Sequence, residues 1–401
     1  MEAHSRLAGA RLALAVTIGT LIACSKDSGK PSAPPPVPPP ELVSDSLATL
    51  DVNDFRISLD RNGLLRDGEW AGQCGVAFVA GLWVGALQEG IPRGNIVWDG
   101  SATWSNYTCR WDTLDIGVYL VTPAHLRNPD LEWPVAWGAP IDSSGAPALY
   151  GDAMAWASLR SDTLLSDPVM RDPIRGLAVS AACFGWDRAD LRNVLFLRYD
   201  LSNQGALPMD SAFVGFYSDT DLAGAQNSTG FDLARGISYT YSPEASPGAP
   251  NYISGYALLD APASEGTVHG VFSHRIMRKN AYLNPDFGET GFSSARQILW
   301  ALEGLSNSGQ SMFDPIAGGP TRYAFTGDPI AGTGWLDQVI DVRGMIASGP
   351  FTLRPGEARS MVVAWVVERG TTRAEALARL KTKIDAIRGE PDLWSPWRPP
   401  A

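Results

Sequence analysis

Short apolar runs separated by turn-forming residues most constrain the fold of this chain. They recur at intervals of about ten to twenty residues, and 41 glycines and 30 prolines are scattered between them. In the run at 193–203, every second residue from Leu195 to Leu201 is Leu or Tyr, which places these side chains on one face of a strand, opposite Phe196. No helical pattern separates the central runs, so the sequence predicts a mainly β fold of antiparallel, β-sandwich-like sheets rather than βαβ units.

Two segments have helical spacing instead. Residues 291–309 place apolar side chains three or four positions apart and predict one internal helix. Near the C-terminus, Thr372 and Glu375 have the spacing of a capping box, and an apolar stripe follows at Leu377, Leu380, Ile384 and Ile387. We expect this C-terminal amphipathic helix to dock on the sheets. Residues 349–370 predict a hairpin that turns at Pro355-Gly356.

The N-terminal residues 1–23 resemble a bacterial lipoprotein signal peptide. Two arginines precede an apolar run of twelve residues, Leu12–Ala23. A membrane-spanning helix needs about twenty residues, so the run has the length of a signal-peptide core. Leu21-Ile22-Ala23-Cys24 is similar to a lipobox, which implies lipidation of Cys24, with palmitate-type acyl chains, and cleavage before it. Ser25 then favours the outer membrane; the alternative is a plain signal peptide with a chance cysteine.

The rest of the chain divides by composition. Residues 24–41 are rich in proline, which favours an extended polyproline II spacer over a proline-motif ligand. We expect a β-rich N-terminal part at 42–170, a β-sandwich-like part with the C-terminal helix at 171–390, and a tail at 391–401.

The net charge narrows the classes of partner that the chain is expected to bind. Loss of residues 1–23 removes one glutamate and two arginines, which changes the formal charge from −11 to −12. Such an acidic chain is not expected to bind nucleic acid, and its contact with the membrane is expected to be the N-terminal lipid.

Three cysteines remain besides Cys24. Cys183 lies in an apolar run and is expected to be buried, and a Cys74–Cys109 disulfide is predicted, with three free thiols as the alternative.

The candidate metal site is the segment 218–232. Asp219 and Asp221 are separated by one residue, and Asp232 follows a loop that contains glycine. Oxygen ligands on a flexible loop suit Ca²⁺. The positions do not match an EF-hand, because Ala223 and Gly230 stand where ligands belong. The sequence predicts a Ca²⁺ site of another kind, with a polar turn as the alternative.

No catalytic motif stands out. His269 and His274 are five residues apart and would lie on opposite faces of a strand, so a zinc pair is not expected. A pair of Asp/Glu residues for glycan hydrolysis cannot be located without distances. Six tryptophans of the first half suit a core or a flat sugar-binding surface: Trp98, Trp104, Trp111, Trp133, Trp137 and Trp156.

Four phrases carry a family resemblance. They are AGLWVGAL (80–87), FVGFYSDTDLAG (213–224), FTGDPIAGTGWLD (325–337) and SGPFTLRPGE (348–357). The chain resembles uncharacterised secreted proteins of Gram-negative bacteria, which often carry a type IX secretion sorting domain. A sorting domain is not expected in this chain, and lipidation is expected to take the place of the type IX secretion route. The resemblance implies an exported β-rich protein and no activity.

Together these features predict a lipoprotein of the cell envelope with a structural or binding role and no identifiable catalysis. A glycan or another envelope protein is the expected partner. The alternatives are a glycan-directed hydrolase that uses an Asp/Glu pair and a carbohydrate-binding module.

Overall fold

The computed structural model describes residues 44–394 except 73, 98–116, 129, 162–171, 225, 244–248, 264, 279–293 and 339–340. The described residues belong to one compact unit, 39–401. The predicted signal peptide, Cys24, the whole proline-rich segment 24–41 and Cys109 lie outside the described residues. No helix among the described residues is long and apolar enough to cross a membrane.

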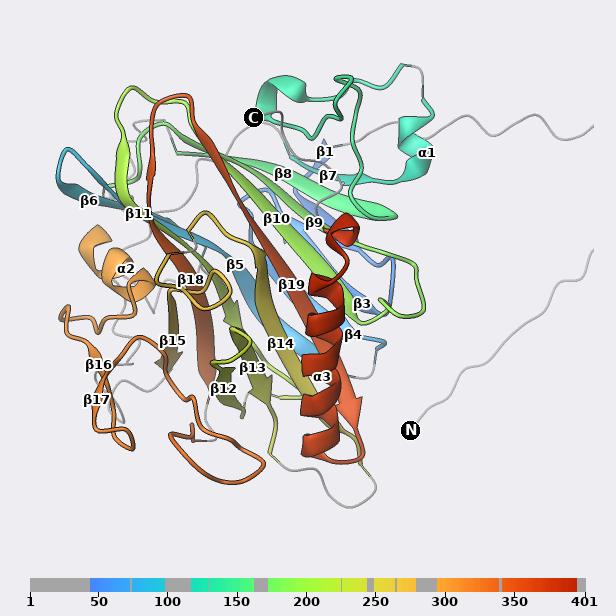
Figure 1. The fold of residues 1–401 in the computed structure, drawn as a ribbon. Helices are drawn as coiled ribbons and strands as arrows, with labels where there is room; N and C mark the ends of the chain where they lie inside the picture. The colour runs from blue at the N-terminus through green and yellow to red at the C-terminus, as the bar shows by residue number, and fades with distance from the viewer. Residues whose placement is uncertain are drawn as a thin grey trace, which may run out of the picture. The chain divides into compact units, whose positions relative to one another are not determined.

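Two large antiparallel sheets form the body, which confirms the predicted mainly β, sandwich-like fold (Figure 1). The first sheet has nine strands in the order β1 (Ser44–Asp45), β7 (Val118–Val121), β8 (Ala153–Ser161), β9 (Leu177–Gly185), β10 (Val194–Asn203), β19 (Ala358–Gly370), β14 (Asn251–Asp260), β13 (Ile237–Tyr241) and β12 (Ser228–Asp232). The second has eight strands: β15 (Ser273–Arg278), β18 (Val342–Leu353), β11 (Met209–Asp219), β5 (Cys74–Gln88), β4 (Leu65–Trp70), β3 (Phe55–Asp60) and β2 (Leu47–Leu50) in order, with β6 (Ile91–Ile96) paired to β5.

Smaller elements lie in the connections. They are the strand pair β16 (Met312–Asp314) and β17 (Gly319–Thr321), the short helix α1 (Pro123–Leu126), and the 3₁₀ turns η1 (Val135–Trp137) and η2 (Pro391–Leu393). Strands from before and after residue 170 pair within both large sheets, as β8 with β9 and β5 with β11 show.

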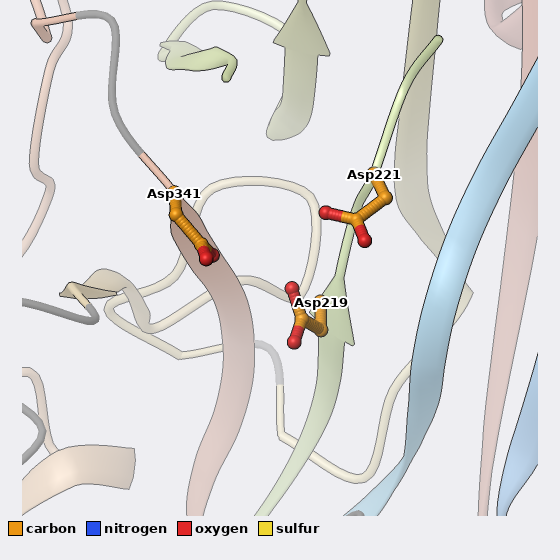
Figure 2. Close-up of side chains that lie close together, drawn as sticks. All are labelled: Asp219, Asp221 and Asp341. Carbon is orange, nitrogen blue, oxygen red and sulfur yellow. The ribbon is translucent and has the colours of Figure 1, made fainter. Parts of the chain in front are cut away.

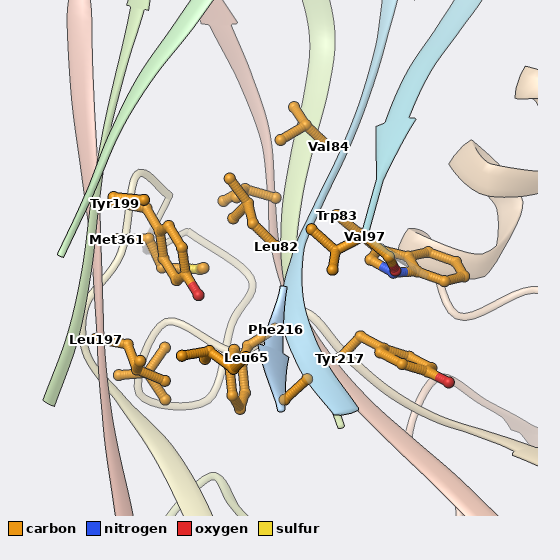
Figure 3. Close-up of a cluster of buried hydrophobic side chains, with 14 of the residues drawn as sticks. Leu65, Leu82, Trp83, Val84, Val97, Leu197, Tyr199, Phe216, Tyr217 and Met361 are labelled. Carbon is orange, nitrogen blue, oxygen red and sulfur yellow. The ribbon is translucent and has the colours of Figure 1, made fainter. Parts of the chain in front are cut away.

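The core lies between the two sheets, and the predicted alternation places its side chains. Leu197 and Tyr199 of β10 point from the nine-stranded sheet toward Leu82 and Phe216 of the other sheet (Figure 3). Phe196, one position away from Leu197, packs instead in the cluster on the outer face of the nine-stranded sheet. The period of two therefore identified both faces of this strand correctly.

The predicted C-terminal helix is confirmed as α3 (Arg373–Arg388), which covers the outer face of β14 and β19 (Figure 1). Thr372 accepts a hydrogen bond from the Glu375 amide at 3.2 Å, while the Glu375 carboxylate accepts one from the Thr371 amide at 2.8 Å. The predicted apolar stripe, Leu377, Leu380, Ile384 and Ile387, is buried. The stripe therefore attaches α3 to the sheet, as expected.

The internal helix is also confirmed, with narrower bounds, as α2 (Ala295–Leu302). Its last residue is Leu302, and Gly304, whose φ of +76° suits glycine, lies just beyond its C-cap Glu303. The helix packs on the outer face of the eight-stranded sheet, where Gly85 and Gly215 present no side chain: a Cβ there would lie 3.0 and 2.7 Å from Leu302. The two glycines thus let the helix approach the strands closely.

The predicted hairpin at 349–370 is wrong. β18 pairs with β11 and β15, whereas β19 pairs with β10 and β14, so the turn at Pro355-Gly356 carries the chain from one sheet to the other. A tight turn between two alternating strands is compatible with either connection. The strands' partners, which lie far along the chain, decide between them.

Candidate metal centre

Three carboxylates meet at one end of the eight-stranded sheet. Asp219 is the last residue of β11, Asp221 follows two positions later, and Asp341 immediately precedes β18. Because the two strands are antiparallel and pair Asp219 with Arg343, the end of β11 lies beside the start of β18. One oxygen from each carboxylate lies within 4.8 Å of the others, and Figure 2 shows them pointing into a shared space.

A guanidinium binds two of these carboxylates. The two terminal nitrogens of Arg343 lie 2.8 Å from Asp219 and 2.7 Å from Asp341. The exposed fractions of the three side chains are 8%, 4% and 13%, so both ion pairs are buried. With Asp221, the group contains three formal negative charges and one positive charge. Its net charge of −2 equals the charge that a divalent cation would neutralise.

The loop that carries Asp221 is held against the neighbouring strand β5. The Ala223 amide donates to the carbonyl of Gly75 at 3.0 Å, and buried Asn227 donates through its side-chain amide to the carbonyl of Gly224. Ala223 and Gly224 both have positive φ, which turns the chain sharply after Asp221. These contacts hold Asp221 beside the two carboxylates that lie at the strand ends.

Asp232, the third predicted ligand, lies elsewhere. It ends β12 in the nine-stranded sheet, because the chain crosses between the sheets after β11. Its carboxylate lies 2.9 Å from Lys381 of α3 and 3.4 Å from Arg235. Burial acts to raise the pKa of Asp232, but the hydrogen bond and charge of Lys381 outweigh it and lower the pKa. Its contacts are therefore those of an ion pair that ties α3 to the sheet.

Asp341 and Arg343 were not singled out from the sequence. They lie in the unremarkable phrase DVRG, far along the chain from Asp219. Only the pairing of β11 with β18 brings them to the site. Carboxylate oxygens are the ligands that hard divalent cations prefer, so the group of Asp219, Asp221 and Asp341 could hold a metal ion.

The cysteines are buried in the described part of the chain. Cys74 begins β5 and donates its thiol hydrogen to the Gly75 carbonyl at 3.0 Å. Burial raises the pKa of Cys74 to about 11, and burial also raises that of Cys183. Cys109 lies outside the described residues, so the Cys74–Cys109 disulfide stays a prediction. Cys183 is buried, as expected.

His269 and His274 lie in different parts of the fold. His274 of β15 is fully buried, with its ring nitrogens 3.0 Å from the Ser238 hydroxyl and 2.9 Å from the Ala324 carbonyl. His269 lies in a turn rather than a strand, with one nitrogen 3.2 Å from the Ala234 carbonyl. Each ring therefore has its own hydrogen-bond partners, which the other ring does not share.

The tryptophans of the first half divide between core and surface. Trp156 is fully buried, and its indole N–H donates to Ser180 at 2.8 Å. Trp133 is partly buried, whereas Trp137 is 40% exposed with the Arg160 guanidinium over its ring. Trp98, Trp104 and Trp111 lie outside the described residues. The expected core role thus holds for Trp156.

Comparisons with known proteins show only distant likeness. No protein-family model matches the sequence, and no curated protein matches it. The fold is similar to a proposed aldose 1-epimerase of Escherichia coli K12, at 10% identity and a TM-score of 0.35 over 80% of this chain and 98% of that one. It is also similar to an amine oxidase of Aspergillus nidulans, at 10% identity and a TM-score of 0.36 over 87% of this chain and 55% of that one. Neither activity is carried over to this chain.

Proposed function

We propose that this protein is a lipid-anchored, Ca²⁺-binding β-sandwich protein of the bacterial cell envelope, with a binding or structural role. One observation carries the cation part of the proposal: Asp219, Asp221 and Asp341 each bring one oxygen within 4.8 Å of the others, beside the guanidinium that pairs with two of them. Ca²⁺ suits this group better than Mg²⁺, because it accepts irregular arrangements of six to eight oxygens, roughly 2.4 Å away. Backbone carbonyls and water would supply the remaining ligands.

The geometry favours a structural role for the ion over a catalytic one. Asp219 and Asp341 sit at strand ends and are bound to a buried arginine, so neither carboxylate is available to transfer a proton without breaking an ion pair. An ion at this place would link β11, β18 and the loop after β11. It would also neutralise the net charge of the group, which otherwise opposes the close approach of Asp221.

The envelope part of the proposal is supported by the N-terminal pattern. The lipobox-like run Leu21-Ile22-Ala23-Cys24, followed by Ser25, supports an outer-membrane lipoprotein. The proline-rich residues that follow support a spacer between the lipid and the folded body.

Unfolding with and without calcium tests the metal centre. In urea, the native protein should gain about 2.7 kcal/mol of stability when free Ca²⁺ is a hundredfold above its Kd, relative to chelator. Asp221→Asn should lose this gain, because it removes one charged ligand and leaves the pairs of Arg343 with Asp219 and Asp341 in place. Asp232→Asn is the matched control: it loses the Lys381 contact but should keep the full response to calcium. Identical midpoints in calcium and chelator for the native protein would refute the site.

A further inference from the structure

A groove of about 500 Å³ lies along the flank of α3, away from the metal centre. This volume is within the range of roughly 300–1,000 Å³ that is typical of small-molecule sites. One wall is a single face of the helix, on which Glu375, Arg379 and Lys383 follow each other at intervals of four residues. The turn before β10, the end of β19 and η2 also contribute lining residues.

The surface that lines the groove is mostly apolar, although six of the lining residues are charged. Leu191, Ile387 and Leu393 supply the larger apolar side chains. Four carboxylates, Asp190, Glu368, Glu375 and Glu390, stand against the two cations Arg379 and Lys383. The groove therefore combines an apolar surface with an excess of negative charge.

Three of these carboxylates form ion pairs. Arg188 lies 2.7 Å from Asp190 and 3.7 Å from Glu390, and Arg379 binds Glu375 within α3. Glu368 differs: it is half-buried on β19 and accepts a hydrogen bond from the Asn193 side-chain amide at 2.7 Å. Within the described ranges it forms no ion pair. A half-buried carboxylate beside apolar surface favours an added cationic partner.

The titration of Glu368 agrees with this geometry. Burial raises its pKa, and the hydrogen bond from Asn193 and the charges of Lys383 and Arg379 oppose that shift only in part. A bound cation would compensate the ionised form of Glu368 for the interactions with water that burial removes.

We propose that this groove binds a small organic cation, an ammonium or guanidinium on an apolar body, with its charge against Glu368 and its apolar part against Leu191, Ile387 and Leu393. The proposal is independent of the metal centre. Charge complementarity selects a cation over a neutral or anionic molecule, and the limited volume selects a small molecule over a folded partner.

Calorimetric titration of the whole protein in chelator, with n-hexylammonium as the probe, tests this proposal. We expect saturable binding that weakens at least tenfold in Glu368→Gln, where the amide can still accept the Asn193 hydrogen bond. n-Hexanol, which has the same apolar body without the charge, should bind at least tenfold more weakly. Lys383→Gln should tighten hexylammonium binding several-fold, because it removes a repelling charge from the groove. Glu357→Gln, at the distant turn between β18 and β19, is the matched control and should leave the affinity unchanged.

Several results would overturn the proposal. These are no binding of hexylammonium to the native protein, equal affinity in Glu368→Gln, or equal affinity for hexanol. A blocked Ala-Lys-Ala peptide that displaces hexylammonium at a much lower concentration would also overturn it, in favour of a protein partner that inserts a basic side chain.

Discussion

At the scale of single residues, Arg343 supplies the positive charge that stabilises the carboxylates of the metal centre when no metal is bound. Its guanidinium is 8% exposed and binds Asp219 and Asp341. Arg343→Met would remove the guanidinium that pairs with Asp219 and Asp341, and we expect a loss of about 3 kcal/mol in chelator. The same change should enlarge the response to calcium, since the ion would then take the place of the lost guanidinium as a counter-charge. Urea unfolding in calcium and in chelator measures both effects.

Arg354 provides the comparison. It also forms an ion pair, with Glu357, but its side chain is 69% exposed. Arg354→Met should change stability by less than about 1 kcal/mol, because exposed ion pairs contribute little. Equal losses for the two variants would show that burial of the Arg343 pairs is not the source of their stabilisation.

His274 makes the stability depend on pH. Burial lowers its pKa from 6.5 to about 4, although its hydrogen bond to Ala324 acts the other way. Between these values the unfolded chain binds a proton that the folded protein does not, so the stabilisation from neutral His274 is complete above pH 6.5 and is lost as the pH falls toward 4. The stability difference between native protein and His274→Asn should therefore narrow by about 3 kcal/mol from pH 7 to pH 4. A difference that stays constant in urea titrations across this range would contradict the prediction.

The sequence could predict only part of the metal centre, for a physical reason. Asp219 and Asp221 could be identified because they are close in sequence at the end of one strand. Residues so placed stay close together in any fold that contains this strand. Asp232 is close in sequence, yet the chain changes sheets before it and places it against α3. Asp341 is distant in sequence and arrives through strand pairing, for which local pattern carries no signal.

At the scale of elements, the contact between α3 and its sheet depends on a missing side chain. Gly255 of β14 lies under Leu380, and a Cβ there would be 2.6 Å from a Leu380 methyl. Gly255→Ala should destabilise the protein by about 1–3 kcal/mol through overpacking, and Leu380→Ala by about 2–5 kcal/mol through the cavity it leaves. The double variant should lose less than the sum, because the added methyl partly fills the cavity.

The double-mutant cycle of Gly255→Ala and Leu380→Ala has a control variant and an outcome that would contradict it. Gly319 in β17 has open space where a Cβ would be and no positive φ, so Gly319→Ala should change the urea midpoint little. Strict additivity of Gly255→Ala and Leu380→Ala would mean that these two positions are not in energetic contact.

Element type and element pairing differed in how well the sequence predicted them. Alternation identified the strands, and spacing with a cap identified α3, because both signals are local. The turn at Pro355-Gly356 shows the limit: β18 and β19 each satisfy the pattern of a hairpin strand but join different sheets. Pairing depends on contacts between distant segments, which the local pattern does not contain.

At the scale of the whole molecule, the sandwich needs no spanning helix to reach a membrane if Cys24 carries lipid. Each buried methylene contributes about 0.8 kcal/mol, and two or more acyl chains give stable anchoring. In a Gram-negative host fed labelled palmitate, the native chain should take up label and its mature N-terminus should be an acylated Cys24. Cys24→Ser should take up none, whereas Cys74→Ser, which alters a buried cysteine of β5, should be labelled like the native chain. An unlabelled native protein with a free N-terminus would exclude the anchor and leave the metal centre and the groove to be judged separately.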